Sequence, residues 1–128
     1  EILQSLNQTC DAIVAAGGNA PKGVRPPGGK INDASKAVLA KAGMPSIIWS
    51  VDTLDWKTRN AQYTIDTVLR QVQDGDIILM HDLYEQSVIA AETLIPELTR
   101  RGYQLVTVSE MAELRGGMAA GQSYGHFR

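Results

Sequence analysis

The stretch Ile77-Ile78-Leu79-Met80-His81-Asp82 decides the fold class that the sequence predicts. Its four apolar residues follow the turn signal Asp74-Gly75-Asp76. A short apolar run bounded by turn residues is typical of a strand buried on both faces, as in a parallel sheet. His81 and Asp82 then lie where this strand ends, and ligands in α/β folds gather at the carboxyl ends of parallel strands. The alternative interpretation is a histidine that only caps a strand end.

Three other segments resemble this strand, and helical patterns separate them. Strands are expected at residues 22–25, 46–51, 76–80 and 103–108, with helices at 2–16, 33–42, 60–72 and 88–101 and a short last helix from Ser109. A β/α unit repeated every 25–30 residues or so implies parallel strands with right-handed crossovers. Four such units make either a small open α/β sheet or about half of an eight-unit (β/α) barrel. Residues 1–114 are the predicted domain, and the Gly- and Ala-rich residues 115–128 are a predicted flexible tail.

Composition excludes several classes of protein. The chain has 128 residues and a net charge of −2, which predicts one domain at most and argues against a nucleic-acid or anionic membrane partner. No apolar stretch is long enough to span a bilayer. Glu1 opens directly onto an amphipathic pattern, so no signal peptide is expected in this chain. The single Cys10 excludes an internal disulfide.

Polar clusters follow three of the four expected strands. These clusters are Arg25-Pro26-Pro27-Gly28-Gly29, then Asp52 with Asp55 and Trp56, then His81 with Asp82. Because parallel strands end on one rim of a sheet, the three clusters are expected on that rim. Together they supply a cation, carboxylates, a titratable imidazole and an aromatic surface, which are the parts of a general acid–base site.

Each cluster also has a simpler interpretation. Arg25 can be a surface arginine on a loop, and the two aspartates can cap the following segment. Trp56 can be a core residue, although an exposed Trp at such a rim favours a surface on which sugars stack. The Gly-rich segment does not match a phosphate-binding loop, because Gly28 precedes Gly29 rather than Lys.

The chain alone provides no convincing metal site. Hydrolytic zinc sites usually take three protein ligands from His, Asp, Glu or Cys. This sequence has two histidines far apart, one cysteine on an expected helix, and no His-x-x-x-His spacing.

The three clusters, in this order, resemble the last three motifs of the polysaccharide deacetylases, the NodB-homology enzymes of carbohydrate esterase family 4. Residues 25–29 resemble the third motif, Arg-Pro-Pro-Tyr-Gly, with Gly28 in place of the tyrosine. Residues 51–56 resemble the Asp-x-x-Asp-Trp motif, and residues 79–81 resemble Leu-x-His. Residues 95–98 and 102–110 also resemble the C-terminal end of that family. The resemblance covers residues 1–114 and implies half of a distorted (β/α) barrel.

The resemblance also implies roles for individual residues. His81 is the expected general acid, Asp55 the carboxylate that pairs with it, and Arg25 the residue that holds a catalytic aspartate. A carboxylate within hydrogen-bond reach favours the protonated imidazole. Four residues are expected to bind substrate: Leu79 at the acetyl methyl group, Trp56 beside the sugar, Gly28 through a backbone N–H at the oxyanion, and Asp52.

The first two family motifs, which carry the base and the metal ligands, have no match in this chain. The resemblance therefore implies the C-terminal half of a deacetylase that removes acetyl groups from peptidoglycan, chitin-like chains or xylan. It implies a divalent metal such as zinc, with ligands in a missing N-terminal half of the same precursor, and an extracellular or cell-envelope location. The alternatives are a metal-free, glycan-binding remnant and a plain doubly wound α/β domain.

Overall fold

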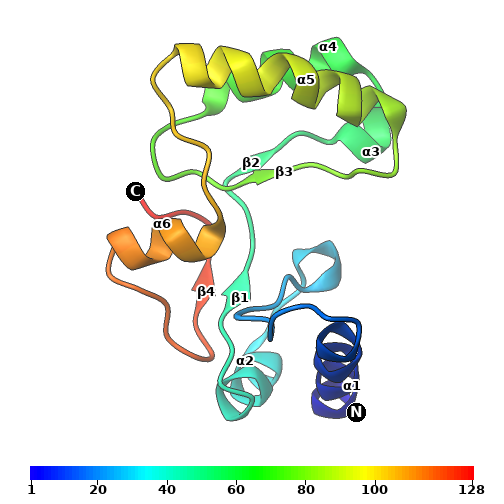
Figure 1. Ribbon diagram of the computed structural model, residues 1–128, viewed down its shortest axis with the longest axis vertical. Coiled ribbons are helices and arrows are strands. Elements are labelled where there is room, and N and C mark those ends of the chain that lie inside the picture. The colour runs from blue at the N-terminus through cyan, green and yellow to red at the C-terminus, as the bar shows by residue number, and fades with distance from the viewer. The chain divides into compact units, whose positions relative to one another are not determined.

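The computed structural model describes residues 1–128 as an α/β chain with short parallel strands (Figure 1). The chain divides into two compact units. The first contains Glu1–Ile48 and Gly116–Tyr124, and the second contains Trp49–Arg115 and Gly125–Arg128. None of the helices combines the length and the apolar character that a transmembrane span requires.

The first unit is built on one short parallel strand pair. Its elements are α1 (Ile2–Ala15), the 3₁₀ turn η1 (Pro27–Gly29), α2 (Asp33–Lys41), β1 (Ser46–Ile47) and β4 (Ser123–Tyr124). β1 pairs parallel with β4, and Val24 adds a single parallel bridge to Ser46. A capping box of Asn32 and Ser35 begins α2, since each side chain accepts a hydrogen bond from the other residue's backbone N–H.

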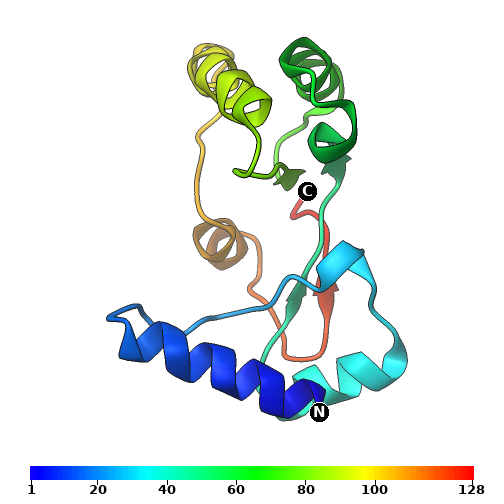
Figure 2. The same ribbon diagram turned by 90° about the vertical axis from the view of Figure 1, so that its right-hand side faces the viewer.

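The second unit packs two helices on a second parallel strand pair. Its elements are β2 (Val51–Asp52), α3 (Asp55–Thr58), α4 (Ala61–Gln71), β3 (Ile78–Leu79), α5 (Glu85–Arg100) and α6 (Val108–Leu114). β2 and β3 pair parallel, with Val51 opposite Ile78 and Asp52 opposite Leu79. Figure 2 shows α4 and α5 side by side. The buried core of this unit is Val51, Ile65, Val68, Ala90, Leu94 and Leu98.

The predicted α/β class with parallel strands is confirmed, but several strands are shorter than expected or lie elsewhere. The expected strand at 22–25 is a single bridge at Val24, and the expected strand at 46–51 divides into β1 and β2, which pair with different partners. The strand predicted at 103–108 is wrong, because residues 103–107 form no strand pairing and α6 begins at Val108. Thr107 and Glu110 form a capping box there, which favours a helix start over a strand.

Residues 115–128 do not trail away as the tail that the sequence predicted. They supply β4, and Phe127 is buried in the second unit. Arg115 pairs with Asp74 at 2.6 Å, and the Arg128 guanidinium pairs with Asp76 at 2.7 Å. A Cβ on Gly75 would lie 2.5 Å from the Phe127 carbonyl oxygen, so only glycine fits beneath this returning segment.

Replacing Thr67 with valine should raise the free energy of unfolding by about 1 kcal/mol, because the Thr67 hydroxyl is buried in α4 without a hydrogen-bond partner. Valine keeps the shape and removes the unpaired polar group. The same exchange at Thr53 should lower the free energy of unfolding, since that buried hydroxyl donates to the Leu79 carbonyl at 2.7 Å. Urea unfolding of both variants measures the two changes in the free energy of unfolding. A change in the same direction for both variants would contradict this account.

Candidate functional site

Asp55 and His81 meet at the carboxyl ends of β2 and β3. Asp55 opens α3 just after β2, and His81 follows β3 after Met80. The His81 Nδ1 lies 2.8 Å from Asp55 Oδ1, and the His81 backbone N–H donates to Asp55 Oδ2 at 2.6 Å. The Asp55 side chain is 2% exposed and the His81 side chain is 26% exposed, so the carboxylate lies beneath an imidazole that reaches solvent.

Ser87 is a third member of this cluster that the sequence analysis missed. Its hydroxyl donates to Asp55 Oδ2 at 2.6 Å, and the residue is buried in the first turn of α5. The expected helix began at Val88, one residue later, so Ser87 fell just outside every predicted element. No sequence motif in the chain indicates this contact, which joins residues 32 positions apart.

The turn between β2 and α3 fixes the direction of Asp55. Asp52 Oδ1 accepts the Leu54 backbone N–H at 3.0 Å, and Thr53 ties this turn to β3 through the Leu79 carbonyl. Leu54 and Arg59, which bracket α3, both have left-handed backbone angles, with φ of 50° and 46°. Such conformations are costly for residues other than glycine and persist where the surrounding contacts hold them.

The environment keeps the Asp55 carboxylate ionised. Burial raises the pKa of Asp55. Hydrogen bonds from Ser87 and His81 lower it by more than burial raises it, so the pKa lies below its ordinary value of 3.8. Asp76, at the opposite end of β3, has a similar balance. Burial raises the pKa of Asp76, while donors from Gln73, Arg128 and Ser50 bring it below 3.8.

The stability of the second unit should therefore fall in acid. A carboxylate whose pKa is lower in the folded chain stabilises the fold above its unfolded pKa, and this contribution is lost as the pH falls through the folded value. We expect the free energy of unfolding to decrease from about pH 5 downward. Asp76→Asn should flatten this dependence without abolishing it, because Asp55 remains. Urea unfolding across the acid range measures the slopes, and identical slopes for the parent and the variant would contradict the assignment.

The structure brings some predicted site residues together and leaves others in the first unit. Asp52, Leu79 and Trp56 belong with Asp55 and His81 in the second unit. Trp56 is 48% exposed and Leu79 is buried. Both Asp52 carboxylate oxygens accept hydrogen bonds, from the Leu54 N–H and the Trp49 indole, as expected of a turn-capping residue.

Arg25 and Gly28 belong to the first unit. Arg25 is exposed on the loop after Val24, and Gly28 lies in η1 with φ of 63°. The left-handed angle explains why glycine suits a position where the resembling motif has tyrosine.

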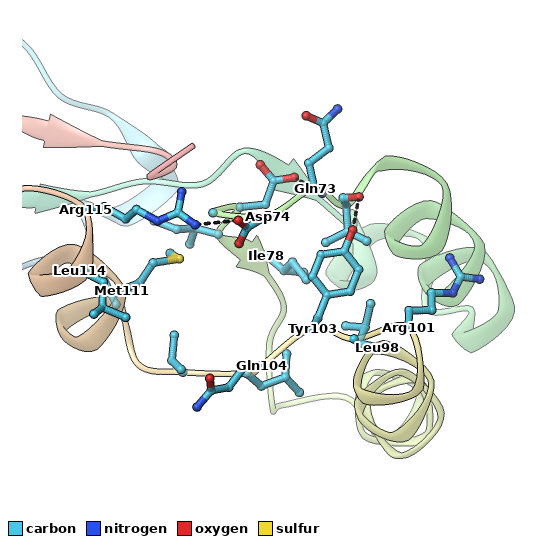
Figure 3. Close-up of a pocket in the computed structure, with 18 residues that line it drawn as sticks. Gln73, Asp74, Ile78, Leu98, Arg101, Tyr103, Gln104, Met111, Leu114 and Arg115 are labelled. Carbon is cyan, nitrogen blue, oxygen red and sulfur yellow. Dashed lines mark hydrogen bonds and ion pairs between the residues drawn. The ribbon is translucent and has the colours of Figure 1, made fainter.

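A separate open groove of about 640 Å³ lies in the second unit, away from the predicted site residues (Figure 3). It is lined by the segment that enters β3, the end of α5 and α6. Tyr103 donates to the Val72 carbonyl in its wall, and Arg115 contacts Asp74. None of the seven residues predicted for catalysis or substrate binding lines it.

The side chains of this chain do not form a metal site by themselves. No three of its His, Cys, Asp and Glu side chains gather where they could hold an ion. Asp55 is committed to His81 and Ser87.

Known proteins resemble this chain in sequence and in fold. A family model described as polysaccharide deacetylase matches residues 1–47. The peptidoglycan-N-acetylmuramic acid deacetylase PdaC of Bacillus subtilis is 44% identical over 90% of this chain. The chain spans only 24% of that relative's length.

Solved structures extend the likeness to nearly the whole chain. A T48 deacetylase solved with substrate is 36% identical, with a TM-score of 0.84 over 93% of this chain and 58% of its own. BA3943 from Bacillus anthracis, a pseudoenzyme of carbohydrate esterase family 4, is 31% identical, with a TM-score of 0.78 over 87% of this chain and 39% of its own. The parallel strands, the paired Asp55 and His81, and these relatives agree, and over most of its length the chain is similar to polysaccharide deacetylases of carbohydrate esterase family 4.

Proposed function

We propose that this chain is the C-terminal part of a hydrolase that removes acetyl groups from a polysaccharide. The observation that carries the proposal is the buried Asp55 bonded to the partly exposed His81 at the end of two parallel strands. A partly exposed imidazole backed by a buried carboxylate is a suitable general acid, because the carboxylate stabilises the charged ring and orients it.

In the proposed reaction, water adds to the acetyl carbonyl and the bond to the sugar nitrogen or oxygen breaks. The protonated His81 gives a proton to that leaving atom, and acetate is the second product. Asp55 holds Nδ1, so the proton leaves from Nε2. The exposed indole of Trp56 offers a face for a sugar ring. Leu79, which is buried in β3, would line the site at the acetyl methyl group.

The remaining roles depend on a second polypeptide segment, which we propose is the N-terminal half of the same precursor. Arg25 would hold a catalytic aspartate from that segment, and the Gly28 N–H would stabilise the oxyanion. A divalent metal such as zinc, with ligands from that segment, would supply Lewis-acid activation when bound. The share of the solved deacetylase that the chain spans, 58%, supports this proposal.

The relative PdaC is named for peptidoglycan, which makes an N-acetylated cell-wall glycan the first substrate to test, in an extracellular or envelope location. The test is co-expression of this chain with an N-terminal deacetylase segment that carries the aspartate and His-x-x-x-His motifs. Acetate release should appear only with both segments and a divalent metal, and should be measured on peptidoglycan, chitin oligomers and acetylated xylan. A metal-loaded pair that releases no acetate from any of the three would reject the proposal.

The second candidate is a metal-free module that binds glycans without hydrolysis. It is favoured by the exposed Trp56 and by the existence of a pseudoenzyme among the relatives. Glycan binding that persists after chelation and disappears in Trp56→Ala, in the absence of acetate release, would support this alternative.

A further inference from the structure

The Ser87 hydroxyl has a role that helix formation does not explain. Ser87 is 3% exposed and is the third residue of α5, beyond the N-cap position from which serine side chains cap a helix. Here the N-cap is Tyr84, which makes no side-chain cap, and the Ser87 hydroxyl points out of the helix to a carboxylate on another element. A buried donor committed to a distant carboxylate orients that carboxylate.

The two oxygens of Asp55 have separate partners as a result. Oδ2 accepts from the Ser87 hydroxyl and from the His81 backbone N–H, both at 2.6 Å. Oδ1 faces the His81 ring at 2.8 Å. The Trp56 backbone N–H is a further donor to this carboxylate, and His81 is the titratable side chain that bonds it. The carboxylate therefore cannot rotate without breaking contacts to three residues.

An ionised carboxylate only accepts hydrogen bonds, so the ring nitrogen that faces Oδ1 must carry a proton. The neutral His81 ring is then the Nδ1–H tautomer, and Nε2 is the nitrogen left for a partner outside the chain. We propose that Ser87 is a positioning residue that acts through Asp55 to hold His81 in this tautomer. The use of this tautomer in catalysis rests on the proposed deacetylase function. The tautomer itself follows from the hydrogen bonds of Asp55 alone.

The test is ¹⁵N NMR of the histidine rings in the 128-residue chain, above the pH at which they are charged. The chain has two histidines, His81 and His126, so His126→Gln assigns the spectrum. The parent should show Nδ1 protonated at His81. Ser87→Ala should add a substantial Nε2–H population and should raise the midpoint of the Asp55 carboxyl titration, because one of the hydrogen bonds that lower the Asp55 pKa is lost. Ser87→Thr, which keeps the hydroxyl, should restore both signals.

Ser46→Ala is the matched control, because Ser46 is also fully buried and its hydroxyl lies 2.6 Å from that of Ser123 in the first unit. It should leave the His81 tautomer unchanged. If Ser87→Ala does not fold, Ser87→Cys keeps the size with a weaker donor and should show an intermediate tautomer mixture. A parent-like tautomer and Asp55 midpoint in the folded variant would overturn the proposal while leaving the deacetylase function untouched. If the NMR changes appear as predicted but the reassembled protein releases no acetate, the role of Ser87 stands and the deacetylase function is rejected.

Discussion

Replacing His81 with alanine should lower the turnover of the reassembled deacetylase by about 10²–10⁴-fold, the usual contribution of a positioned general acid. The variant removes the only titratable side chain that bonds Asp55, while the backbone N–H of residue 81 can still donate to Asp55 Oδ2. The fold of the second unit should therefore survive. Acetate release under saturating substrate, with metal content measured on the same sample, gives the result.

His126→Ala is the control for this prediction, because it removes the other histidine of the chain. His126 forms an antiparallel bridge with Asp76, at the opposite end of β3 from His81, so its loss should leave turnover close to the parent value. Metal content should be the same in both variants. Parent-like turnover in His81→Ala would remove the general acid from the mechanism.

The sequence predicted the ends of β2 and β3 better than it predicted the strands themselves. The turn after Asp52 and the His81 that follows Leu79 carry local signals, because apolar runs and turn residues mark a strand end within a few positions. The register that sets Asp52 opposite Leu79 then brings Asp55 to His81. This part of the site followed from the pattern and from the resemblance together.

The errors have two physical causes, and both concern contacts that a local pattern does not reveal. β4 and the burial of Phe127 depend on contacts far along the chain, from Ser123 to Ser46 and from Phe127 to Gly75. A Gly- and Ala-rich segment has no apolar period that reveals such pairing. Residues 103–107 have the opposite character, since their β-branched composition favours a strand, yet no neighbour pairs with them. Ser87 was missed because, like β4, it depends on a contact far along the chain, in this case a single carboxylate.

Replacing Asp55 with asparagine should lower both the free energy of unfolding and the turnover of the reassembled enzyme. The loss of a buried charge that pairs with His81 should lower the free energy of unfolding by about 3 kcal/mol. The asparagine amide has only one acceptor oxygen and a donor NH2 in place of the other, so residue 55 can no longer accept from both the Ser87 hydroxyl and the His81 ring. Turnover of the reassembled enzyme should fall by about 10²-fold or more, because the imidazole loses the group that orients it and stabilises its charge.

Asp76→Asn separates the two effects of Asp55→Asn. Asp76 is also a buried carboxylate with a lowered pKa, and it accepts from the Gln73 N–H, the Ser50 hydroxyl and the Arg128 guanidinium. Asp76 lies before β3, whereas Asp55 contacts His81, beyond the other end of β3. We therefore expect both variants to lose stability in urea unfolding and only Asp55→Asn to lose turnover when each is assayed folded, well below its unfolding temperature. Equal losses of turnover would mean that Asp55 acts through stability alone, and the pair with His81 would then be structural rather than catalytic.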